Sequence, residues 1–191
     1  ILEHRVPDHL YIGNQFCHLL FPERKLLFEI IEKAAAEQVE ITLVFSYIRE
    51  YMLDYITELL DEINRWCEEK RQSVEIVVND WGMASLVKKS RRNLIPSLGI
   101  LLNKRRKDPR IPFKKGEQKW FERNSLNAGF YRNFLEREYG IQRFEWESCG
   151  YEQQIPPGKN SLHIPFYQTN TSQYCPLGAV CETGERGRQK L

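Results

Sequence analysis

The chain has 191 residues, of which 41% are hydrophobic and 28% charged, and its formal net charge is +2. This composition fits one domain with a single sizeable core. No apolar run approaches the roughly 20 residues that a membrane-spanning helix needs, and the first residues lack the basic and then apolar layout of a signal peptide. We therefore expect one cytoplasmic domain over residues 1–191, without membrane association.

Hydrophobic periodicity predicts strands and helices in alternation. Strands are expected at residues 10–13, 39–45, 74–78, 94–102, 143–147 and 161–168, and helices at 22–37, 51–70, 82–89 and 126–139. Pro96 and Gly99 interrupt the fourth strand, which indicates a barrel bend or a sheet edge. Ser125 is the expected N-cap of the last helix, and Gly140 is its expected end.

Alternating strands and helices favour a parallel sheet with helices outside. The predicted fold class is α/β, with a TIM-barrel-like parallel sheet. A complete eight-fold barrel usually needs about 250 residues, and this sequence supplies about six strands. We therefore expect an incomplete or truncated barrel, or an open sheet, followed by a cysteine-bearing C-terminal tail at residues 170–191.

Five cysteines in a chain without an export signal argue against a disulfide framework. Cys17 follows the first expected strand, Cys149 the fifth, and Cys175 and Cys181 lie in the tail. Function in parallel α/β folds gathers at the carboxyl ends of strands, and thiolates from several loops suit a soft metal or an iron–sulfur cluster. The alternative is that they are small buried hydrophobes, our interpretation of Cys67 on the apolar face of the second helix.

Other polar residues follow the expected strands. Asn79 and Asp80 come directly after the third strand and are the candidate catalytic residues, because a carboxylate there could activate water on a bound cation. His18 and His163 could join a metal site or be ordinary hydrogen-bonded histidines. Motifs for nucleotide loops, serine nucleophiles and zinc proteases are absent.

Positive charge is concentrated between residues 88 and 123, where the sequence has thirteen Lys or Arg and only three acidic residues. Lys104, Arg105, Arg106 and Lys107 are the candidate substrate-binding residues, predicted to form an exposed patch for RNA or another anionic partner. A solvated loop without a partner is the alternative interpretation.

Several short motifs resemble a known family. They are Tyr11-Ile-Gly-Asn-Gln-Phe-Cys17, Val78-Asn-Asp-Trp-Gly82, Gly99-Ile-Leu-Leu-Asn103, Tyr139-Gly-Ile-Gln-Arg143 and the cysteine-bearing tail. In this order the sequence is similar to the collagenase-like peptidases of unassigned mechanism, family thirty-two of that class. Its relatives include accessory proteins for oxygen-independent ubiquinone hydroxylation and RNA-hydroxylating enzymes.

The resemblance implies a barrel-like fold and, in some branches, a [4Fe–4S] cluster held by four cysteines. Cys17, Cys175 and Cys181 match ligand positions. The fourth ligand is expected downstream of Cys181, so either the chain shown stops short of it or Cys149 substitutes. Zinc, or no metal at all, is the alternative to a cluster.

Three functions follow from these observations. The first is a redox enzyme or accessory protein in oxygen-independent hydroxylation of RNA or a small aromatic substrate. The second is a metal-assisted peptidase, and the third is a non-catalytic RNA-binding or assembly protein. RNA, or a partner protein of the same family, is the expected partner.

Overall fold

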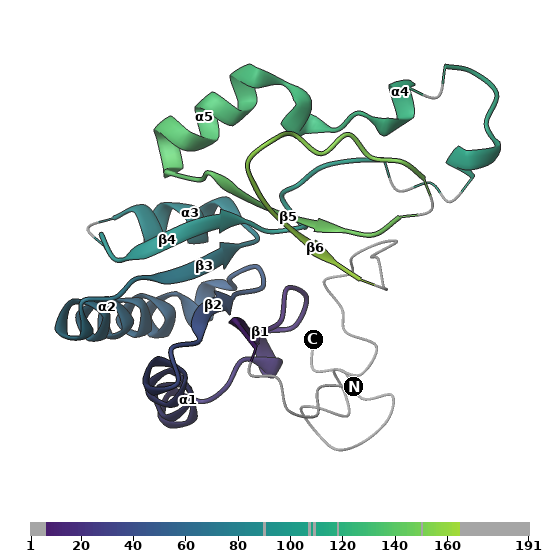
Figure 1. The fold of residues 1–191 in the computed structure, drawn as a ribbon. Helices are drawn as coiled ribbons and strands as arrows, with labels where there is room; N and C mark the ends of the chain where they lie inside the picture. The colour runs from purple at the N-terminus through teal and green to yellow at the C-terminus, as the bar shows by residue number, and fades with distance from the viewer. Residues whose placement is uncertain are drawn as a thin grey trace, which may run out of the picture.

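The computed structural model describes residues 7–89, 91–106, 108, 110–117, 119–149 and 151–164. One parallel sheet of six strands runs through this part of the chain, with the spatial order of the strands equal to their sequence order (Figure 1). The strands are β1 (His9–Gly13), β2 (Glu40–Val44), β3 (Val74–Val78), β4 (Leu94–Leu98), β5 (Arg143–Glu147) and β6 (Lys159–His163). The predicted α/β class with a parallel sheet is therefore confirmed.

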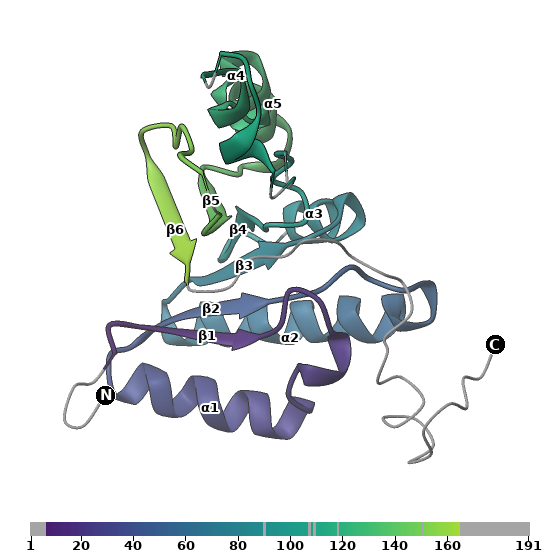
Figure 2. The ribbon, with the colours of Figure 1, turned by 90° about the vertical axis from the view of Figure 1, so that its right-hand side faces the viewer.

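The sheet curls into a half-barrel. In Figure 2 the strands turn progressively from β1 to β6, so that β5 and β6 stand at a steep inclination to β1 and β2. The neighbouring strands β1 and β2 pair over five residues, and so do β3 and β4, and β5 and β6. Helices cover the convex face of this sheet (Figure 2), whereas side chains on its concave face are in part exposed, Ile95 to 48%.

The predicted defect in the fourth strand is present, but the strand is not an edge. β4 lies between β3 and β5, and its ladder to β5 covers only Ser97 and Leu98. Pro96 is buried within the strand and has no N–H to donate to a ladder. Edge placement was therefore wrong, because the shortened ladder accommodates the proline inside the sheet.

Four helices accompany the strands, and a fifth is a single short turn. They are α1 (Arg24–Ala36), α2 (Leu53–Lys70), α3 (Trp81–Lys88), α4 (Lys119–Glu122) and α5 (Gly129–Tyr139). Single 3-10 turns occupy His18–Leu20, Glu50–Met52, Ile111–Phe113 and Ser125–Asn127. None of the described helices has the length and apolarity that crossing a bilayer would require.

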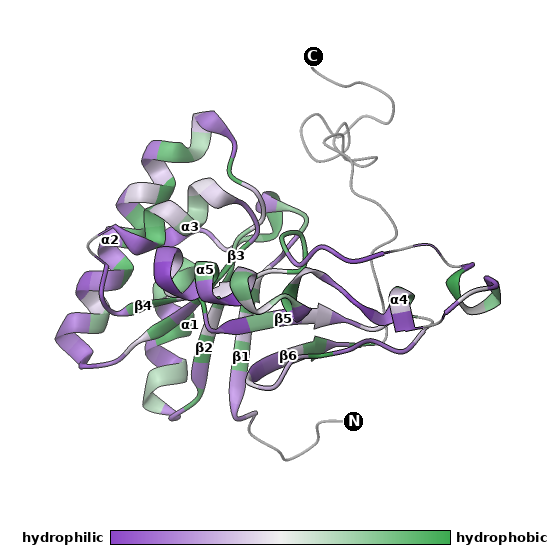
Figure 3. Ribbon diagram, turned by 90° about the horizontal axis from the view of Figure 1, so that it is seen from above, coloured by the Kyte–Doolittle hydropathy of each residue, from purple (hydrophilic) through white to green (hydrophobic). Residues whose placement is uncertain are grey.

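The hydrophobic core lies between the helices and the convex face of the sheet. Its members alternate along strands β2 to β5, as the two-residue period of a strand requires; in β3 they are Val74, Ile76 and Val78. The helices supply one apolar stripe each, and hydrophobic and hydrophilic residues alternate around the turns of α2 (Figure 3). Cys67 is fully buried in this core, as predicted.

The two ends of α5 are fixed by different residues. Gly140 terminates α5 in the left-handed conformation, with φ of 71°, as predicted. Ser125 is not the N-cap of that helix: the Asn124 side chain accepts a hydrogen bond from Leu126 N and caps the preceding 3-10 turn. The helix itself begins only at Gly129.

The connection from β4 to β5 extends away from the layered body (Figures 1 and 3). It carries the turn Ile111–Phe113 and α4. Two aromatic side chains on it, Phe113 and Trp120, are exposed.

Candidate functional site

Loops at the carboxyl ends of β1, β5 and β6 meet at one residue, His163. Its Nε2 lies 3.3 Å from Gln15 Nε2, two residues before Cys17. Its carbonyl oxygen accepts a hydrogen bond from Ser148 N, one residue before Cys149, at 3.0 Å. The loops that carry these two cysteines therefore adjoin the end of β6, from which the chain continues toward the tail.

The loop after β1 is fixed by a glycine and an asparagine. Gly13 has φ of 110°, and a Cβ there would lie 2.3 Å from Val44 O, so only glycine fits. Asn14 Oδ1 then accepts hydrogen bonds from Phe16 N and Cys17 N, at 2.8 and 3.0 Å. These contacts hold the Cys17 backbone in a defined position at the carboxyl edge of the sheet.

Two of the four predicted ligand cysteines can be described. Cys17 and Cys149 are half-buried free thiols, and the Cys149 thiol donates to Tyr151 O at 3.2 Å. Cys175 and Cys181 lie outside the described residues. The described residues alone contain no group of three or more His, Cys, Asp or Glu side chains that could hold a metal ion.

Asn79 and Asp80, the predicted catalytic residues, hold neighbouring loops. Asn79 Nδ2 donates to Phe45 O at 2.8 Å, and its Oδ1 accepts from Leu101 N at 3.2 Å. Asp80 caps α3 by accepting from Met83 N and also accepts from Ile48 N, both at 2.8 Å. These bonds give both side chains a structural role, and their catalytic role stays a prediction.

The predicted basic patch is divided. Lys104 and Arg106 are exposed, and Lys107 lies outside the described residues. The exposure predicted for Arg105 is wrong: its side chain is 3% exposed and forms an ion pair of 2.8 Å with Glu147, itself 2% exposed. The acid on the facing strand β5 draws the guanidinium inward, and Arg105 also donates to Glu147 O and Gln153 Oε1.

His18, the other predicted histidine, contacts Tyr51: its Nε2 lies 3.1 Å from the Tyr51 hydroxyl. The two residues come from the turns that precede α1 and α2. A role of His18 as a ligand stays a prediction.

A network of polar side chains lies on the concave face, and of its members only His163 was among the predicted candidate residues. Its members are His9, Tyr11, Thr42, Glu75, Arg143, Glu145, Ser161 and His163. The Tyr11 hydroxyl lies 2.9 Å from Ser161 Oγ and 3.3 Å from Glu145 Oε1 and can donate its one proton to either. A side chain of β1 thereby reaches β5 and β6, which lie at the other end of the strand order.

An ion pair and a histidine–carboxylate pair are the charged parts of this network. Arg143 Nε lies 3.3 Å from Glu75 Oε2 and 3.1 Å from Ser161 Oγ. Glu145 has no exposed surface and is bonded to His163, whose side chain is 37% exposed. A buried carboxylate that orients a partly accessible imidazole is an arrangement able to accept and donate protons.

Burial shifts the proton affinities of this network. Burial raises the pKa of Glu75 above its ordinary value, although the positive Arg143 and the hydrogen bond from Thr42 oppose the shift. Burial likewise raises the pKa of Tyr11, against the hydrogen bond to Ser161. Burial alone would lower the pKa of Arg143, but nearby Glu75 and Tyr11 raise it overall. The phenol and the guanidinium therefore stay protonated at neutral pH.

The sequence does contain a signal for this network. Polar residues occupy alternate positions in the last two strands, Arg143-Glu145-Glu147 in β5 and Lys159-Ser161-His163 in β6. A two-residue period places them on one face of the sheet. The complete burial of one of them, Glu145, within such a polar face makes the concave face a candidate ligand-binding or catalytic surface.

The fold and this surface define an α/β half-barrel protein with a polar concave face and cysteine-bearing loops at its carboxyl edge. No protein-family model, curated protein or solved structure gives a significant match to the chain. The case for a function therefore depends on the residues themselves.

Proposed function

We propose that Cys17, Cys149, Cys175 and Cys181 hold a metal ion or a [4Fe–4S] cluster at the carboxyl edge of a TIM-barrel-like fold. In this proposal the protein acts in oxygen-independent hydroxylation of RNA or of a small aromatic substrate. The carrying observation is the double contact of His163 with the loops that bear Cys17 and Cys149. The segment with the other two cysteines begins directly after this histidine.

The donor set fits such a group chemically. Cys17 and Cys149 are unpaired thiols with partial access to solvent, whereas Cys67 is enclosed in the core. Soft thiolate ligands select zinc or an iron–sulfur centre. Thiolates gathered in one place repel one another, so a cation is needed to keep them ionised. Two thiols are too few, which is why the proposal requires Cys175 and Cys181.

A bound cluster would supply electrons one at a time to a reaction on the adjoining surface. The chain's own contribution is the polar network beside it. His163 and Glu145 can hold or move a proton, and the protonated Tyr11 hydroxyl can exchange its hydrogen bond to Glu145 or Ser161 for one to a substrate oxygen. Lys104 and Arg106 provide exposed positive charge for an anionic substrate such as RNA.

The test is the iron, sulfide and zinc content of the full chain purified without oxygen. We expect iron and acid-labile sulfide, or zinc, in the wild type and a sharp loss in Cys17→Ser and Cys149→Ser. Cys67→Ser is the matched control, because its thiol lies in the core and it should retain the metal. Absence of metal from the anaerobic wild type, or equal metal content in Cys17→Ser and Cys67→Ser, would contradict the proposal.

A further inference from the structure

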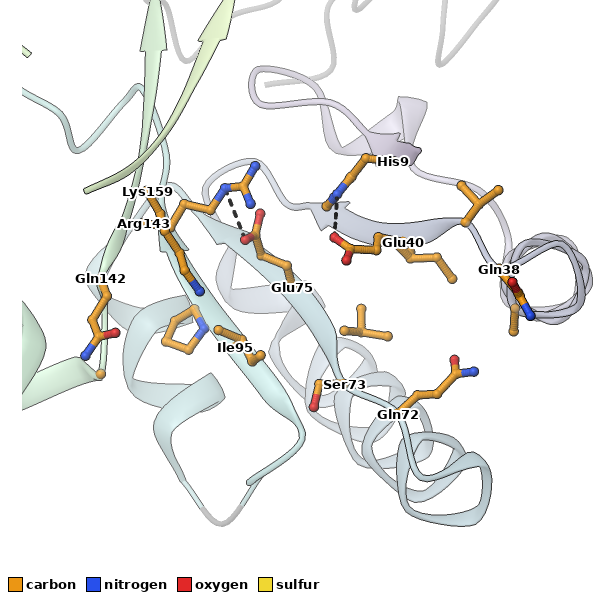
Figure 4. A pocket seen from close by; sticks show the side chains of 16 residues that line it. His9, Gln38, Glu40, Gln72, Ser73, Glu75, Ile95, Gln142, Arg143 and Lys159 are labelled. Carbon is orange, nitrogen blue, oxygen red and sulfur yellow. Dashed lines mark hydrogen bonds and ion pairs between the residues drawn. The ribbon is translucent and has the colours of Figure 1, made fainter. Parts of the chain in front are cut away.

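A cavity of about 520 Å³ lies at the amino end of the sheet, opposite the cysteine-bearing loops. The first residues of several strands line it, among them His9, Glu40, Arg143 and Lys159 (Figure 4). Its volume falls within the range of about 300–1,000 Å³ that small-molecule sites occupy. The cavity is thus large enough for a metabolite of modest size.

Both signs of charge line this cavity. Lys159 of β6 and Arg143 of β5 are the cations; Glu75 of β3 forms an ion pair with Arg143 at 3.3 Å, and Glu40 of β2 lies further along, beside His9 (Figure 4). With two cations and two carboxylates, the lining does not favour a multiply charged anion or cation. A ligand with separated positive and negative groups would find a partner for each.

Some of these charged groups are available to a ligand. Lys159 forms no ion pair or hydrogen bond within the described part of the chain and is exposed. Glu40 is 79% exposed, and its contact is with the imidazole of His9 at 3.2 Å. Arg143 Nε and Nη2 contact Glu75, Ser161 and Tyr11, whereas its Nη1 forms no hydrogen bond within the described part of the chain.

The remaining lining is apolar or neutral. Ile95 and Pro96 of β4 also line the cavity, and Ile95 is exposed although it belongs to an interior strand. Gln38 and Gln72 add amide side chains at the rim, on the side of Glu40 (Figure 4). An exposed apolar side chain beside a cation and a carboxylate suits a short hydrocarbon group carried by a zwitterion.

We propose that this cavity binds an amino acid or dipeptide with an apolar side chain. The ligand carboxylate lies against Lys159 and Arg143, and the ammonium group faces Glu40 and Glu75. The side chain covers Ile95 and Pro96. This site is separate from the cysteine-bearing edge and does not depend on a metal there.

The test is calorimetric titration of the full chain with L-leucine and leucyl-leucine, compared with N-acetyl-L-leucine and L-leucinamide. We expect at least one zwitterion to bind, and each blocked compound, which lacks one charge, to bind at least tenfold more weakly. Lys159→Gln and Glu40→Gln should each weaken the zwitterion at least tenfold. Lys25→Gln, on the exposed face of α1, is the matched control and should bind as the wild type.

Thermal unfolding of each variant separates a lost site from a lost fold. Lys159 has no ion pair in the described structure, so its replacement should leave the unfolding temperature unchanged. The proposal is overturned if neither zwitterion binds at millimolar concentration, or if the blocked compounds bind as tightly. It is equally overturned if folded Lys159→Gln and Lys25→Gln bind alike. Binding of succinate or inorganic phosphate in preference to leucine would assign the cavity to anions instead.

Discussion

Replacing Glu147 by glutamine should destabilise the protein strongly, because it leaves the buried Arg105 guanidinium without its counter-ion. The Arg105 guanidinium lies 2.8 Å from the Glu147 carboxylate, and the two side chains are 3% and 2% exposed. Removing one partner of such a pair leaves an uncompensated buried charge and costs about 3–5 kcal/mol. Whole domains of this size are stable by about 5–15 kcal/mol, so the loss would be a large fraction of the total.

Removing both charges should cost less than removing one. In the double variant Arg105→Met with Glu147→Leu, no charge remains to be desolvated, and apolar groups of similar volume occupy the site. Urea unfolding followed by circular dichroism gives both free energies of unfolding. The control is Glu29→Gln, since its exposed pair with Lys25 spans 3.9 Å and should contribute less than about 0.5 kcal/mol. A cost below about 1 kcal/mol for Glu147→Gln, or a double variant less stable than the single one, would refute this reasoning.

Three further changes test other parts of the structure. Burial raises the pKa of Cys67 to about 11. Above pH 9 the unfolded chain loses this proton while the folded chain keeps it, so the free energy of unfolding should fall by up to about 1.4 kcal/mol per pH unit. Cys67→Ala should remove this decline in urea titrations across that range. Arg71 adopts φ of 55° after α2; Arg71→Gly should raise the free energy of unfolding by about 1 kcal/mol in thermal melts. Asp80→Ala should lower it by about 1–2 kcal/mol by the same measurement, since a helix cap is lost.

Local patterns in the sequence were sufficient for most of the elements. The nearly continuous apolar run at 74–78, interrupted only by Glu75, gives β3 with the predicted bounds, Val74–Val78, because such a run is typical of a strand buried on both faces. The helical stripe in 22–37 gives α1, which begins two residues later, at Arg24. A predicted boundary differs from the observed one where a capping residue outside the apolar pattern fixes it. Asn124, for example, caps the 3-10 turn that precedes α5.

The concave network could not be predicted in the same way. Tyr11 and Ser161 are 150 residues apart and form a hydrogen bond only because the sheet curls β1 toward β6. Curling is a property of all six strands together, and no local window contains it. The inward turn of Arg105 has the same origin, since the acid that pairs with it is on β5, 42 residues away.

The polarity of the concave face indicates that the residues there serve a function other than packing. Covering Glu145 completely costs free energy unless partners compensate it, and the chain meets this cost with Tyr11 and His163. A sheet built for stability alone would place aliphatic side chains there, as the convex face does. Hydrogen bonds run from Arg143 at the cavity through Ser161 and Tyr11 to Glu145 and His163, beside the cysteine-bearing loops. The costly residues thus lie along a path that joins the two ends of the sheet for which we propose ligands.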